Sequence, residues 1–469
     1  MTRSLLALFC LYLLNSCNNK EIEPLEALSV STTVISDITY NSANSGGEIM
    51  YNKANGIISR GVCWNVLINP TTDNSFIENG FGTGSFSLTI TNLEPDRTYF
   101  VRAYATTKDS TVYGNELNFT TLKRPEIIYY GNLLLETQQD VNDFFEQGYT
   151  EITGELTIGD VFNVSSSISD LSKLSNLRTI GESLFVYNNS ELANLEGLNN
   201  LESIGKDIQI KGNLSLSNID ALNKISTIKR QVYIVENNSL VNLNGLLNIT
   251  TINDRLFIVG NPVLNDITGL KNIESVGSDL AISNTLVESI DALKNLNSVG
   301  RNLYISENSY LTNINGLMNL VQLNGLLSIK SNSALTDIGG LHNLTKIEGS
   351  LFITNNDQLI NVNGLTSLTE VGDLYIRDND ILDNINDLEH IVTIGEFLSI
   401  ENNNKLANLN GLDNLLSVGW ALFIKDNLNL NDLCSLKPLL TNDYDVSYTV
   451  TGNLYNPSRQ DILDSNCSQ

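Results

Sequence analysis

The stretch LFVYNNSELANLEGLNNLESIGKD, residues 184–207, decides the fold because the chain repeats its pattern with a fixed period. It opens with a tripeptide of two aliphatic residues around a variable one, and the chain holds eleven such copies. Successive copies are 24 residues apart, except for two steps of 23 residues, at 280 to 303 and at 351 to 374. A regular period of this length predicts a solenoid of stacked coils. The copies are Leu184-Phe185-Val186, Ile208-Gln209-Ile210, Val232-Tyr233-Ile234, Leu256-Phe257-Ile258, Leu280-Ala281-Ile282, Leu303-Tyr304-Ile305, Leu327-Ser328-Ile329, Leu351-Phe352-Ile353, Leu374-Tyr375-Ile376, Leu398-Ser399-Ile400 and Leu422-Phe423-Ile424.

One coil alone lacks the core that it would need to be stable. Its seven aliphatic residues contribute about 1.5 to 3 kcal/mol each when buried, whereas ordering its 24 residues costs about 1 to 2 kcal/mol per residue. We therefore expect the coils to stack and to share hydrogen bonds. An earlier copy, Leu156-Thr157-Ile158, lies 28 residues before the first and is expected to open the stack.

An asparagine follows the tripeptide by three residues in ten of the eleven copies. In the remaining copy Asn284 comes one residue early, in a coil that is itself one residue short. Stacked about 4.8 Å apart, these amides can bond turn backbone that no strand pairs, and each such group left unpaired costs about 1 to 3 kcal/mol. We predict a structural ladder made of Asn189, Asn213, Asn237, Asn261, Asn308, Asn332, Asn356, Asn379, Asn403 and Asn427.

The repeated pattern resembles the leucine-rich solenoid of receptor L domains, the hormone-binding modules of insulin-type and epidermal-growth-factor-type receptors. The resemblance covers residues 156–436 and implies a right-handed leucine-rich β-solenoid. The chain departs from the commonest leucine-rich repeat, because Ile180 precedes Leu184 by four residues instead of three and no repeat helix is written between the strands. It also has more coils than those receptor domains, so the identity of their ligands does not carry over.

Both ends of the solenoid are predicted to carry caps. In the N-terminal cap, residues 128–155, the segment from Thr137 to Asp140 has the pattern of a capping box and indicates a short helix. Val141 and Phe144 give this helix an apolar side that is expected to cover the open end of the stack. Residues 437–469 are the predicted C-terminal cap.

Five cysteines are present, of which Cys10 and Cys17 lie in the first 17 residues. Cys434 and Cys467 bracket the C-terminal cap. In an exported protein a disulfide closing a loop of this size adds about 3 to 4 kcal/mol, and we predict that these two residues pair. The remaining residue, Cys63, is expected to be a buried thiol.

Residues 27–122 contain short alternating stretches separated by turn residues, which is typical of a β-sandwich. The segment Leu93-Glu94-Pro95-Asp96-Arg97-Thr98-Tyr99, followed by Val101-Arg102-Ala103-Tyr104-Ala105 and Phe119-Thr120-Thr121, resembles a fibronectin type III domain. That resemblance implies that the hydroxyl of Tyr99 returns to the preceding corner. Such a module could bind a ligand through its loops or serve as a spacer above a membrane.

The first residues, MTRSLLALFCLYLLNSC, combine a basic start with an apolar run too short to span a bilayer, as in a secretion signal. Leu14-Asn15-Ser16-Cys17 resembles a bacterial lipobox, which implies a signal peptide at 1–16 and a lipid on Cys17. The linker at 17–26 begins CNNKEIE and resembles the sorting tag of Bacteroidetes-type surface lipoproteins. These resemblances imply a protein anchored in the outer membrane by lipid alone and facing the cell exterior, the alternative being an ordinary signal peptide with a chance cysteine.

The middle residue of each tripeptide is the candidate ligand-binding position. If the outer two residues point inward, the middle one points to solvent, because side chains alternate along a strand. Seven of the eleven middle residues are aromatic in a chain that is only 7% aromatic, which favours a partner site. The alternative is that the rings only stabilise the face of the sheet. These candidate residues are Phe185, Tyr233, Phe257, Tyr304, Phe352, Tyr375 and Phe423, and the basic residues beside them are Lys211, Lys330, Arg377 and Lys425.

No motif for catalysis, phosphate binding or metal binding is present in the sequence, and no cofactor is expected. Coil length varies by one residue, which leaves no inserted loop to carry an active site. The net charge of −26 would repel nucleic acid and anionic lipid. We therefore predict an all-β, non-enzymatic protein of the cell surface, with a sandwich followed by a solenoid, that binds or adheres to a protein ligand. The alternative is a glycan-capture lipoprotein of a polysaccharide uptake system.

Overall fold

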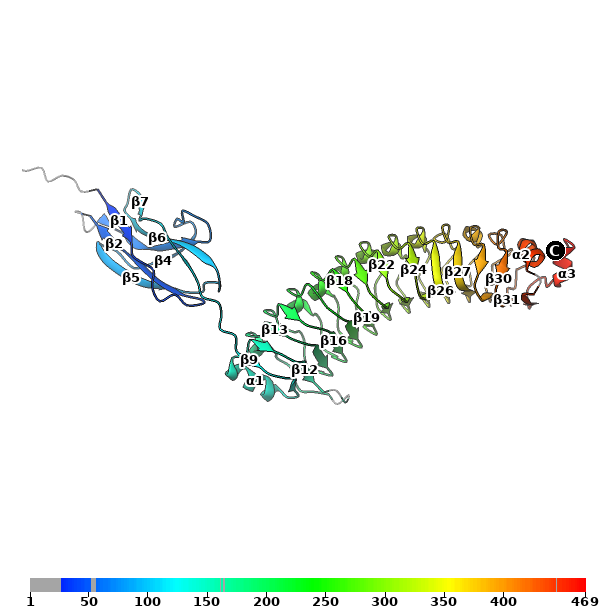
Figure 1. The fold of residues 1–469 in the computed structure, drawn as a ribbon, viewed down its shortest axis with the longest axis horizontal. Helices are drawn as coiled ribbons and strands as arrows, with labels where there is room; N and C mark the ends of the chain where they lie inside the picture. Colours follow the sequence, from blue (N-terminus) through cyan, green and yellow to red (C-terminus); the bar gives the residue numbers. More distant parts are fainter. Residues whose placement is uncertain (1–26, 52–55, 161, 163–164, 444) are drawn as a thin grey trace, which may run out of the picture. The chain divides into compact units, whose positions relative to one another are not determined.

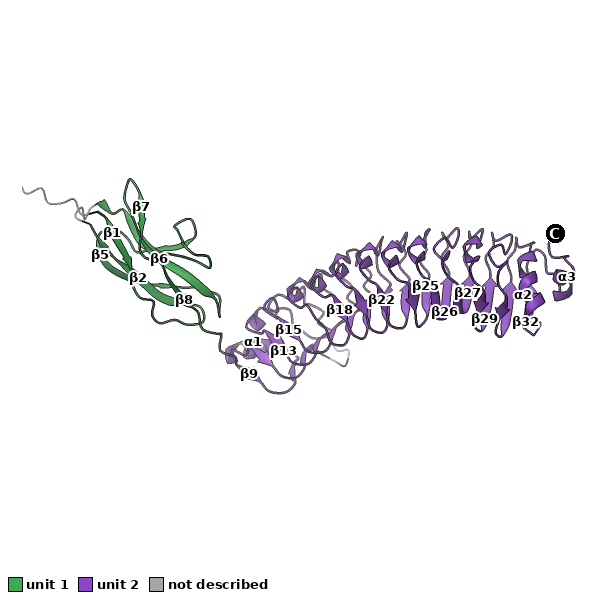
Figure 2. Ribbon diagram, turned by 45° about the horizontal axis from the view of Figure 1, so that its top comes forward, with its two compact units in different colours: residues 1–125 green, residues 126–469 purple. Residues whose placement is uncertain are grey.

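The computed structural model describes residues 27–51, 56–160, 162, 165–443 and 445–469. The chain divides into two compact units, with the boundary between Pro125 and Glu126 (Figure 2). The predicted signal peptide at 1–16, the lipidation site Cys17 and the linker at 17–26 lie outside the described residues.

The first unit is a sandwich of two antiparallel sheets. Its core includes Ile49 and Ile90 from one sheet, and Val62 and Val101 from the other, all at most 1% exposed. One sheet contains β1 (Ser29–Thr32), β2 (Ala43–Met50) and β5 (Gly84–Ile90). The other contains β4 (Ser75–Glu78), β3 (Ser59–Asn65), β6 (Thr98–Thr106), β7 (Thr111–Tyr113) and β8 (Leu117–Thr120).

Two residues singled out in the sequence have defined places in this sandwich. The hydroxyl of Tyr99 accepts a hydrogen bond from the backbone N–H of Glu94 at 3.0 Å, which is the contact expected of a tyrosine corner. Cys63 is fully buried in β3, and its thiol donates to the carbonyl oxygen of Pro70 at 3.4 Å. Burial raises the pKa of this thiol to about 11.

The second unit is a solenoid whose coils stack along one axis (Figure 1). The long strands of successive coils pair in parallel, with the tripeptides in register from coil to coil. They belong to a sheet of 17 strands, which also includes three two-residue strands from coils that already contribute a long strand, Gln322–Leu323, Thr393–Ile394 and Ser417–Val418. The strands are β10 (Leu133–Leu135), β12 (Leu156–Gly159), β14 (Leu184–Tyr187), β16 (Ile208–Lys211), β17 (Val232–Val235), β19 (Leu256–Val259), β21 (Leu280–Ser283), β23 (Leu303–Ser306), β24 (Gln322–Leu323), β25 (Leu327–Lys330), β26 (Lys346–Thr354), β27 (Glu370–Arg377), β28 (Thr393–Ile394), β29 (Phe397–Glu401), β30 (Ser417–Val418), β31 (Ala421–Lys425) and β32 (Ser447–Thr451).

Shorter strands form two further parallel sheets on the coils. One contains β15 (Ser203–Ile204), β13 (Thr179–Ile180), β11 (Glu151–Ile152) and β9 (Ile128–Tyr129), and the other contains β18 (Thr251–Ile252), β20 (Ser275–Val276) and β22 (Ser298–Val299). Between the sheets lies the core, in which the coil beginning at Leu184 buries all seven of its aliphatic side chains to 3% exposure or less. The stacked coils therefore share one continuous apolar core.

The sequence shows no repeat helix between the strands, and most described coils contain only a single turn of 3-10 helix there. An Asn, Asp or Ser side chain accepts from the backbone N–H two residues later at several of these turns, as Asp266 does from Thr268 at 2.8 Å. A turn of three residues is too short to produce a helical period in the sequence. These turns are η2 (Ser172–Leu174), η3 (Asp220–Leu222), η4 (Asn244–Leu246), η5 (Thr268–Leu270), η6 (Asp291–Leu293), η7 (Asn315–Leu317), η8 (Gly339–Leu341), η9 (Asn386–Leu388) and η10 (Cys434–Leu436).

The segments at the ends of the solenoid contain the α-helices. Helix α1 (Gln138–Gln147) buries Val141 and Phe144 in the solenoid core. At the other end, α2 (Lys437–Asn442) and α3 (Arg459–Leu463) contribute Leu439, Leu440 and Ile462 to the same core. A disulfide joins Cys434 to Cys467, with their Cα atoms 4.9 Å apart, and closes this segment.

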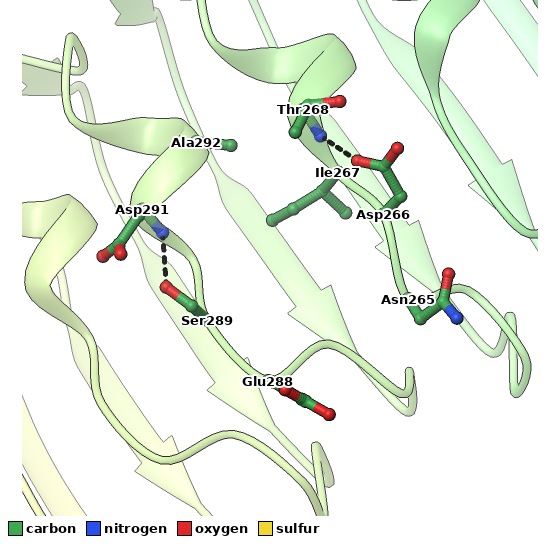
Figure 3. A pocket seen from close by; sticks show the side chains of 8 residues that line it. All are labelled: Asn265, Asp266, Ile267, Thr268, Glu288, Ser289, Asp291 and Ala292. Atoms are coloured by element: carbon green, nitrogen blue, oxygen red, sulfur yellow. Dashed lines mark hydrogen bonds between the residues drawn. The ribbon is translucent and has the colours of Figure 1, made fainter.

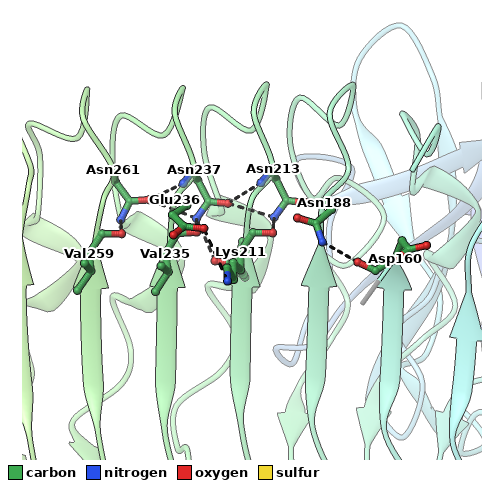
Figure 4. A network of polar contacts seen from close by, with 10 residues as sticks. Asp160, Asn188, Lys211, Asn213, Val235, Glu236, Asn237, Val259 and Asn261 are labelled. Carbon is green, nitrogen blue, oxygen red and sulfur yellow. Dashed lines mark hydrogen bonds and ion pairs between the residues drawn. The ribbon is translucent and has the colours of Figure 1, made fainter. Parts of the chain in front are cut away.

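The asparagine column lies at the ends of the long strands and is completely buried (Figure 4). The backbone N–H and the side-chain amide of Asn213 both donate to Oδ1 of Asn237, at 3.2 and 3.1 Å. The same amide also donates to the carbonyl oxygen of Val186 in the preceding coil at 2.9 Å. Each rung thus links three successive coils and satisfies backbone at the turn.

The column is interrupted in the first of the two 23-residue coils, which begins at Leu280. Thr285 takes the position of the asparagine there, and its hydroxyl donates to Oδ1 of Asn308 at 2.7 Å. Asn284, the asparagine that comes one residue early in this coil, lies in the turn instead and has a positive φ of 53°. In the described part of the chain no hydrogen bond joins Asn261 to Thr285, whose hydroxyl oxygen instead accepts from the backbone N–H of Val287 at 3.5 Å. The column continues through the second 23-residue coil, where Asn356 donates to Asn379 at 3.1 and 3.4 Å.

Candidate functional site

The outer face of the long sheet carries the candidate ligand-binding residues. Strand pairing places Phe185, Gln209, Tyr233 and Phe257 side by side in one column. The column continues through Ala281, Tyr304, Ser328, Phe352, Tyr375, Ser399 and Phe423. All seven aromatic candidates are half-buried.

The expectation that every middle residue points freely to solvent was wrong at two positions. Ser399 is 0% exposed and Ala281 is 6% exposed. Both are small side chains below the level of their larger neighbours, which cover Ser399 but surround an open hollow at Ala281. The rings consequently form separate groups rather than one uninterrupted stripe.

Two adjacent pairs of rings make direct contact. Phe352 and Tyr375 are stacked, with centroids 4.7 Å apart and planes only 4° from parallel. Tyr233 and Phe257 meet edge to face at 4.9 Å. Both geometries are favourable for aromatic pairs. In the stacked pair, one face of each ring is already covered by the other, so these rings are not freely available for stacking on a sugar.

Two of the four gaps in the column are filled by the protein itself. At Gln209, the hydroxyl of Tyr187 donates to the side-chain oxygen at 2.6 Å while its ring stacks on Phe185. At Ser399, the hydroxyl accepts from Nε of Arg377 at 2.8 Å and donates to Glu401 at 2.6 Å. The same guanidinium lies over the ring of Tyr375 at 4.8 Å.

The other two gaps are open hollows. The hollow at Ala281 has a volume of about 560 Å³ and is mostly apolar. It is lined by Lys211, Tyr233, Val235, Phe257, Val259, Ala281 and Tyr304. The hollow at Ser328 measures about 400 Å³ and carries two cations. It is lined by Ser328, Lys330, Phe352, Thr354, Asn355, Arg377 and Asp378.

The basic residues beside the column differ in their surroundings. The ammonium of Lys211 lies 3.7 Å from the carboxylate of Glu236, and Arg377 lies 3.3 Å from Glu401. Lys425 lies over the ring of Phe423 at 4.6 Å. Lys330, by contrast, has an exposed side chain beside the hollow at Ser328.

The sequence analysis missed two aromatic residues near the end of this face. Phe397 lies in β29 two residues before Ser399, and its ring is close to parallel with those of Trp420 and Phe423. The centroids are 5.8 Å from Trp420 and 6.4 Å from Phe423. Trp420 is 66% exposed. The sequence analysis considered only the middle residue of each tripeptide and so did not include these rings. Phe397 pairs with Ala421, two residues before Phe423, so Phe397 and Phe423 lie on the same face of the sheet.

A polar hollow of about 380 Å³ lies at the turns near the short coil (Figure 3). Asp266, Glu288 and Asp291 line it, but Asp266 already accepts from Thr268, and Ser289 accepts from the backbone N–H of Asp291 at 3.0 Å. Among the described residues, no group of three His, Cys, Asp or Glu side chains is placed to hold a metal ion. Within the same residues, no helix is long and apolar enough to cross a membrane.

Comparison with known proteins supports the repeat architecture. Residues 156–280 and 210–325 match a family described as BspA type leucine rich repeat region, in six copies. No curated protein matches the chain in sequence. Solved structures that match include a myokine structure, at 17% identity over 21% of this chain and 100% of that chain, with a TM-score of 0.17.

Two further solved structures match over the same share of this chain. One is the sensor domain of the anti-sigma factor RsgI4 in Pseudobacteroides cellulosolvens, at 18% identity over 21% of this chain and 76% of that one, with a TM-score of 0.17. The other is a fibronectin type III domain derived from the human KIAA0970 protein, at 18% identity over 21% of this chain and 77% of that one, with a TM-score of 0.17.

Proposed function

We propose that this chain is a non-catalytic binding or adhesion protein of the cell surface, which presents the outer face of its long sheet to a protein ligand. The observation that carries the proposal is the pair of open hollows, one lined by Tyr304 and the other by Phe352, in a column of half-buried rings. Aromatic side chains in partly enclosed surroundings are typical of residues that dominate protein interfaces. The match to BspA type leucine rich repeats supports a role in protein interaction or adhesion.

The regularity of the coils supports the absence of catalysis. Active sites on repetitive scaffolds are usually carried by loops inserted between regular elements. Here the repeat spacing varies by only one residue over eleven copies. We propose on this ground that the protein needs no cofactor and performs no reaction on its ligand.

Capture of a glycan is the second candidate, and Trp420 favours it. An exposed indole with a nearly parallel phenyl ring beside it provides apolar surface on which a sugar could pack. This surface is separate from the hollows around Tyr304. The two candidates therefore involve different residues, and substitutions can distinguish them.

One experiment tests both candidates. The exported chain carrying Cys17→Ser, which cannot be lipidated, is applied to arrays of extracellular proteins and of glycans. A double variant, Tyr304→Ala with Phe352→Ala, is expected to lose the protein ligand. Its matched control removes one tyrosine and one phenylalanine that are 58% and 81% exposed elsewhere, Tyr310→Ala with Phe162→Ala, and is expected to bind normally.

The outcomes separate the possibilities. Glycan binding that is lost in Trp420→Ala but retained in the double variant would establish the second candidate. A wild-type chain that binds neither array would refute both. Release of product from any bound glycan would contradict the proposal that the protein is not an enzyme.

We also propose that the mature protein is anchored to the outer membrane through a lipid on Cys17 and is directed away from the cell. The support is the lipobox-like sequence and the tag that follows it. Mass spectrometry of the N-terminal peptide from the native host is expected to find an acylated Cys17. A mature N-terminus at any other residue would contradict the anchor.

A further inference from the structure

One end of the sandwich carries three large apolar side chains in contact with solvent. Met50 is 58% exposed, Ile58 is 60% exposed and Phe81 is 78% exposed. Met50 ends β2, Ile58 precedes β3, and Phe81 lies in the loop between β4 and β5. Exposed apolar groups that gather on one surface often mark a contact with a protein or a membrane. These three residues are called the apolar tip below.

Strand pairing and a backbone hydrogen bond bring the three residues to the same end of the sandwich. The pairing of Ile49 with Gly84 places the end of β2 beside the start of β5, directly after the loop that carries Phe81. In that loop, the backbone N–H of Gly82 donates to the carbonyl oxygen of Ile57 at 3.3 Å. This bond joins the loop to the segment that enters β3.

The loop that carries Phe81 is held in place by Arg60. The guanidinium of Arg60 donates to the carbonyl oxygens of Asn79 at 3.2 Å, Gly82 at 3.3 Å and Thr83 at 2.9 Å. These bonds fix the backbone on both sides of Phe81. The exposed ring is therefore presented to solvent by a loop of defined conformation.

The chain enters the sandwich at the apolar tip and leaves it at the opposite end. β1 begins at Ser29, which pairs with Met50. β8 ends at Thr120, which pairs with Thr98 at the start of β6, whereas the last residue of β6 pairs with Ser59 beside the tip. β6 has nine residues and advances about 3.3 Å per residue, so the two ends are about 26 Å apart.

The predicted lipidation site is close to the apolar tip along the chain. Ala27, the first described residue, follows Cys17 by ten positions. Ten residues span at most about 33 to 36 Å when fully extended. A lipid on Cys17 would therefore keep this end of the sandwich within that distance of the bilayer surface, where the burial of apolar area strengthens membrane binding.

We propose that the apolar tip inserts into the headgroup region of the bilayer that holds the lipid anchor, and that the sandwich stands on the membrane with this end down. The partner of the tip is a lipid surface. This inference rests on the proposed anchor at Cys17. The position of the tip, at the end that the anchor brings to the bilayer, favours lipid over a protein ligand.

The charges near the apolar tip predict which lipid it contacts. Among the described residues at this end, Glu48 and Glu78 are exposed, and Arg60 is bonded to the loop. Lys108 and Asp109, in the turn after β6, have opposite charges. The tip is therefore expected to bind zwitterionic lipid, and addition of anionic lipid should not strengthen its binding.

Fluorescence quenching by brominated lipid tests the proposal on the full mature chain. A chain that begins at Cys17 is coupled through this thiol to maleimide lipid in phosphatidylcholine vesicles that contain brominated acyl chains. The described cysteines do not compete, because Cys63 is buried and the other two form a disulfide. Phe81→Trp is expected to add emission that lies at short wavelength and is quenched by the bromine atoms.

Leu67→Trp is the matched control for that substitution. Leu67 is also exposed, but it lies in the loop after β3, at the opposite end of the sandwich. The emission that this tryptophan adds is expected to be unquenched and to lie at long wavelength. The chain without either substitution supplies the signal of its native tryptophans, which is subtracted from both.

Partition between water and vesicles supplies a second test that needs no added tryptophan. With a single myristoyl chain on Cys17, binding is weak enough to be reversible. Ile58→Ser with Phe81→Ser is expected to weaken binding at least about tenfold, because two apolar side chains no longer leave water. Leu67→Ser with Ile68→Ser removes side chains that are 68% and 65% exposed and should not change binding. Circular dichroism verifies that each variant is folded.

Equal quenching of the two added tryptophans, or no quenching of either, would overturn the inference. Unchanged partition of the variant at the tip would do the same. A tip that avoids lipid but is required for binding a protein on the arrays would be a protein site, which also excludes the inference.

The design separates failure of the inference from failure of the proposed anchor. Because the lipid is attached chemically, the quenching and partition results do not depend on lipidation in the cell. Mass spectrometry of the native N-terminal peptide tests that step by itself. A native chain without lipid on Cys17 would refute the anchor and the inference together, whereas the outcomes above refute the inference alone.

Discussion

The side-chain amide of Asn427 donates a hydrogen bond to Oδ1 of Asn453 at 3.0 Å, so the asparagine column continues past the last repeat into the C-terminal cap. Asn453 completes the pattern by donating to the carbonyl oxygen of Ile424 at 2.9 Å. The side-chain amide of Asn453 also donates to Oδ1 of Asn456, in the same turn, at 3.0 Å. The cap therefore ends the column by supplying a last rung whose remaining amide hydrogen is satisfied locally.

The buried rungs are expected to contribute far more to stability than exposed asparagines in the same coils. In Asn332→Ala, the backbone N–H and the side-chain amide of Asn308 both lose their acceptor, Oδ1 of Asn332. The carbonyl oxygen of Ile305 loses the side-chain amide that donates to it. Each buried group left unpaired costs about 1 to 3 kcal/mol, so we expect a loss of several kcal/mol in the free energy of unfolding. Urea denaturation followed by circular dichroism measures this loss.

Asn343→Ala is the matched control for that substitution. Asn343 is exposed and makes one hydrogen bond to the preceding coil, to the carbonyl oxygen of Met318 at 2.8 Å. Water can replace this bond, so a change of about 1 kcal/mol or less is expected. Equal losses in the two variants would contradict a special role for the buried column.

The disulfide is expected to stabilise the C-terminal cap. Cys434 and Cys467 are separated by 33 residues, and opening a loop of that length costs about 3 to 4 kcal/mol in the chain-entropy description. The double variant Cys434→Ser, Cys467→Ser should therefore expose the end of the solenoid to proteases at lower denaturant concentration. Wild-type protein treated with a reducing agent should behave in the same way, and resistance to proteolysis in both samples would argue against this role.

Cys63 is expected to be unreactive toward alkylating agents in the folded protein and reactive after unfolding. Burial raises its pKa to about 11, so the folded state holds the proton at a pH where the unfolded thiol has lost it. The unfolded state then binds fewer protons, and stability falls as the pH rises from the usual thiol range toward 11. Mass spectrometry after timed alkylation measures the reactivity, and rapid labelling of native protein would contradict the buried position.

The same substitution, Ser to Phe, is expected to destabilise the protein at one serine of the ring column and to leave its stability nearly unchanged at another. Ser399→Phe must displace the guanidinium of Arg377 and the carboxylate of Glu401 from a fully buried position, which should cost about 1 to 3 kcal/mol. Ser328→Phe adds a ring to an open hollow beside Phe352 and should leave stability nearly unchanged. Thermal denaturation compares the two directly, and equal effects would contradict the distinction between filled and open gaps.

Much of the fold could be predicted because its period is written in the sequence. The strict recurrence of pairs such as Leu184 and Val186 indicated both the strand register and the core, since a side chain and its neighbour two residues on share one face. The short 3-10 turns could not be predicted this way. They are held by single side chains, such as Asp266, rather than by a repeating apolar pattern.

The candidate site was predictable in position but not in shape. The sequence indicates that Tyr304 and Phe352 share a column, but whether the gaps between rings are open depends on residues outside the column. Tyr187 and Arg377 fill two of the gaps from the neighbouring positions, two residues farther along their strands. Phe397 adds a ring from the other side for the same reason. Contacts of this kind require three-dimensional geometry and leave no periodic signal.

The bonds of each asparagine reach only the coil before and the coil after it, and this has a genetic consequence. Duplication or loss of one complete 24-residue unit by unequal recombination would leave every other rung with its partners. The length of the solenoid, and with it the reach of the protein, can therefore change in a single hereditary step. At Thr285 the column breaks because that 23-residue coil has no asparagine at this position, whereas the second 23-residue coil keeps its rung through Asn356 and Asn379.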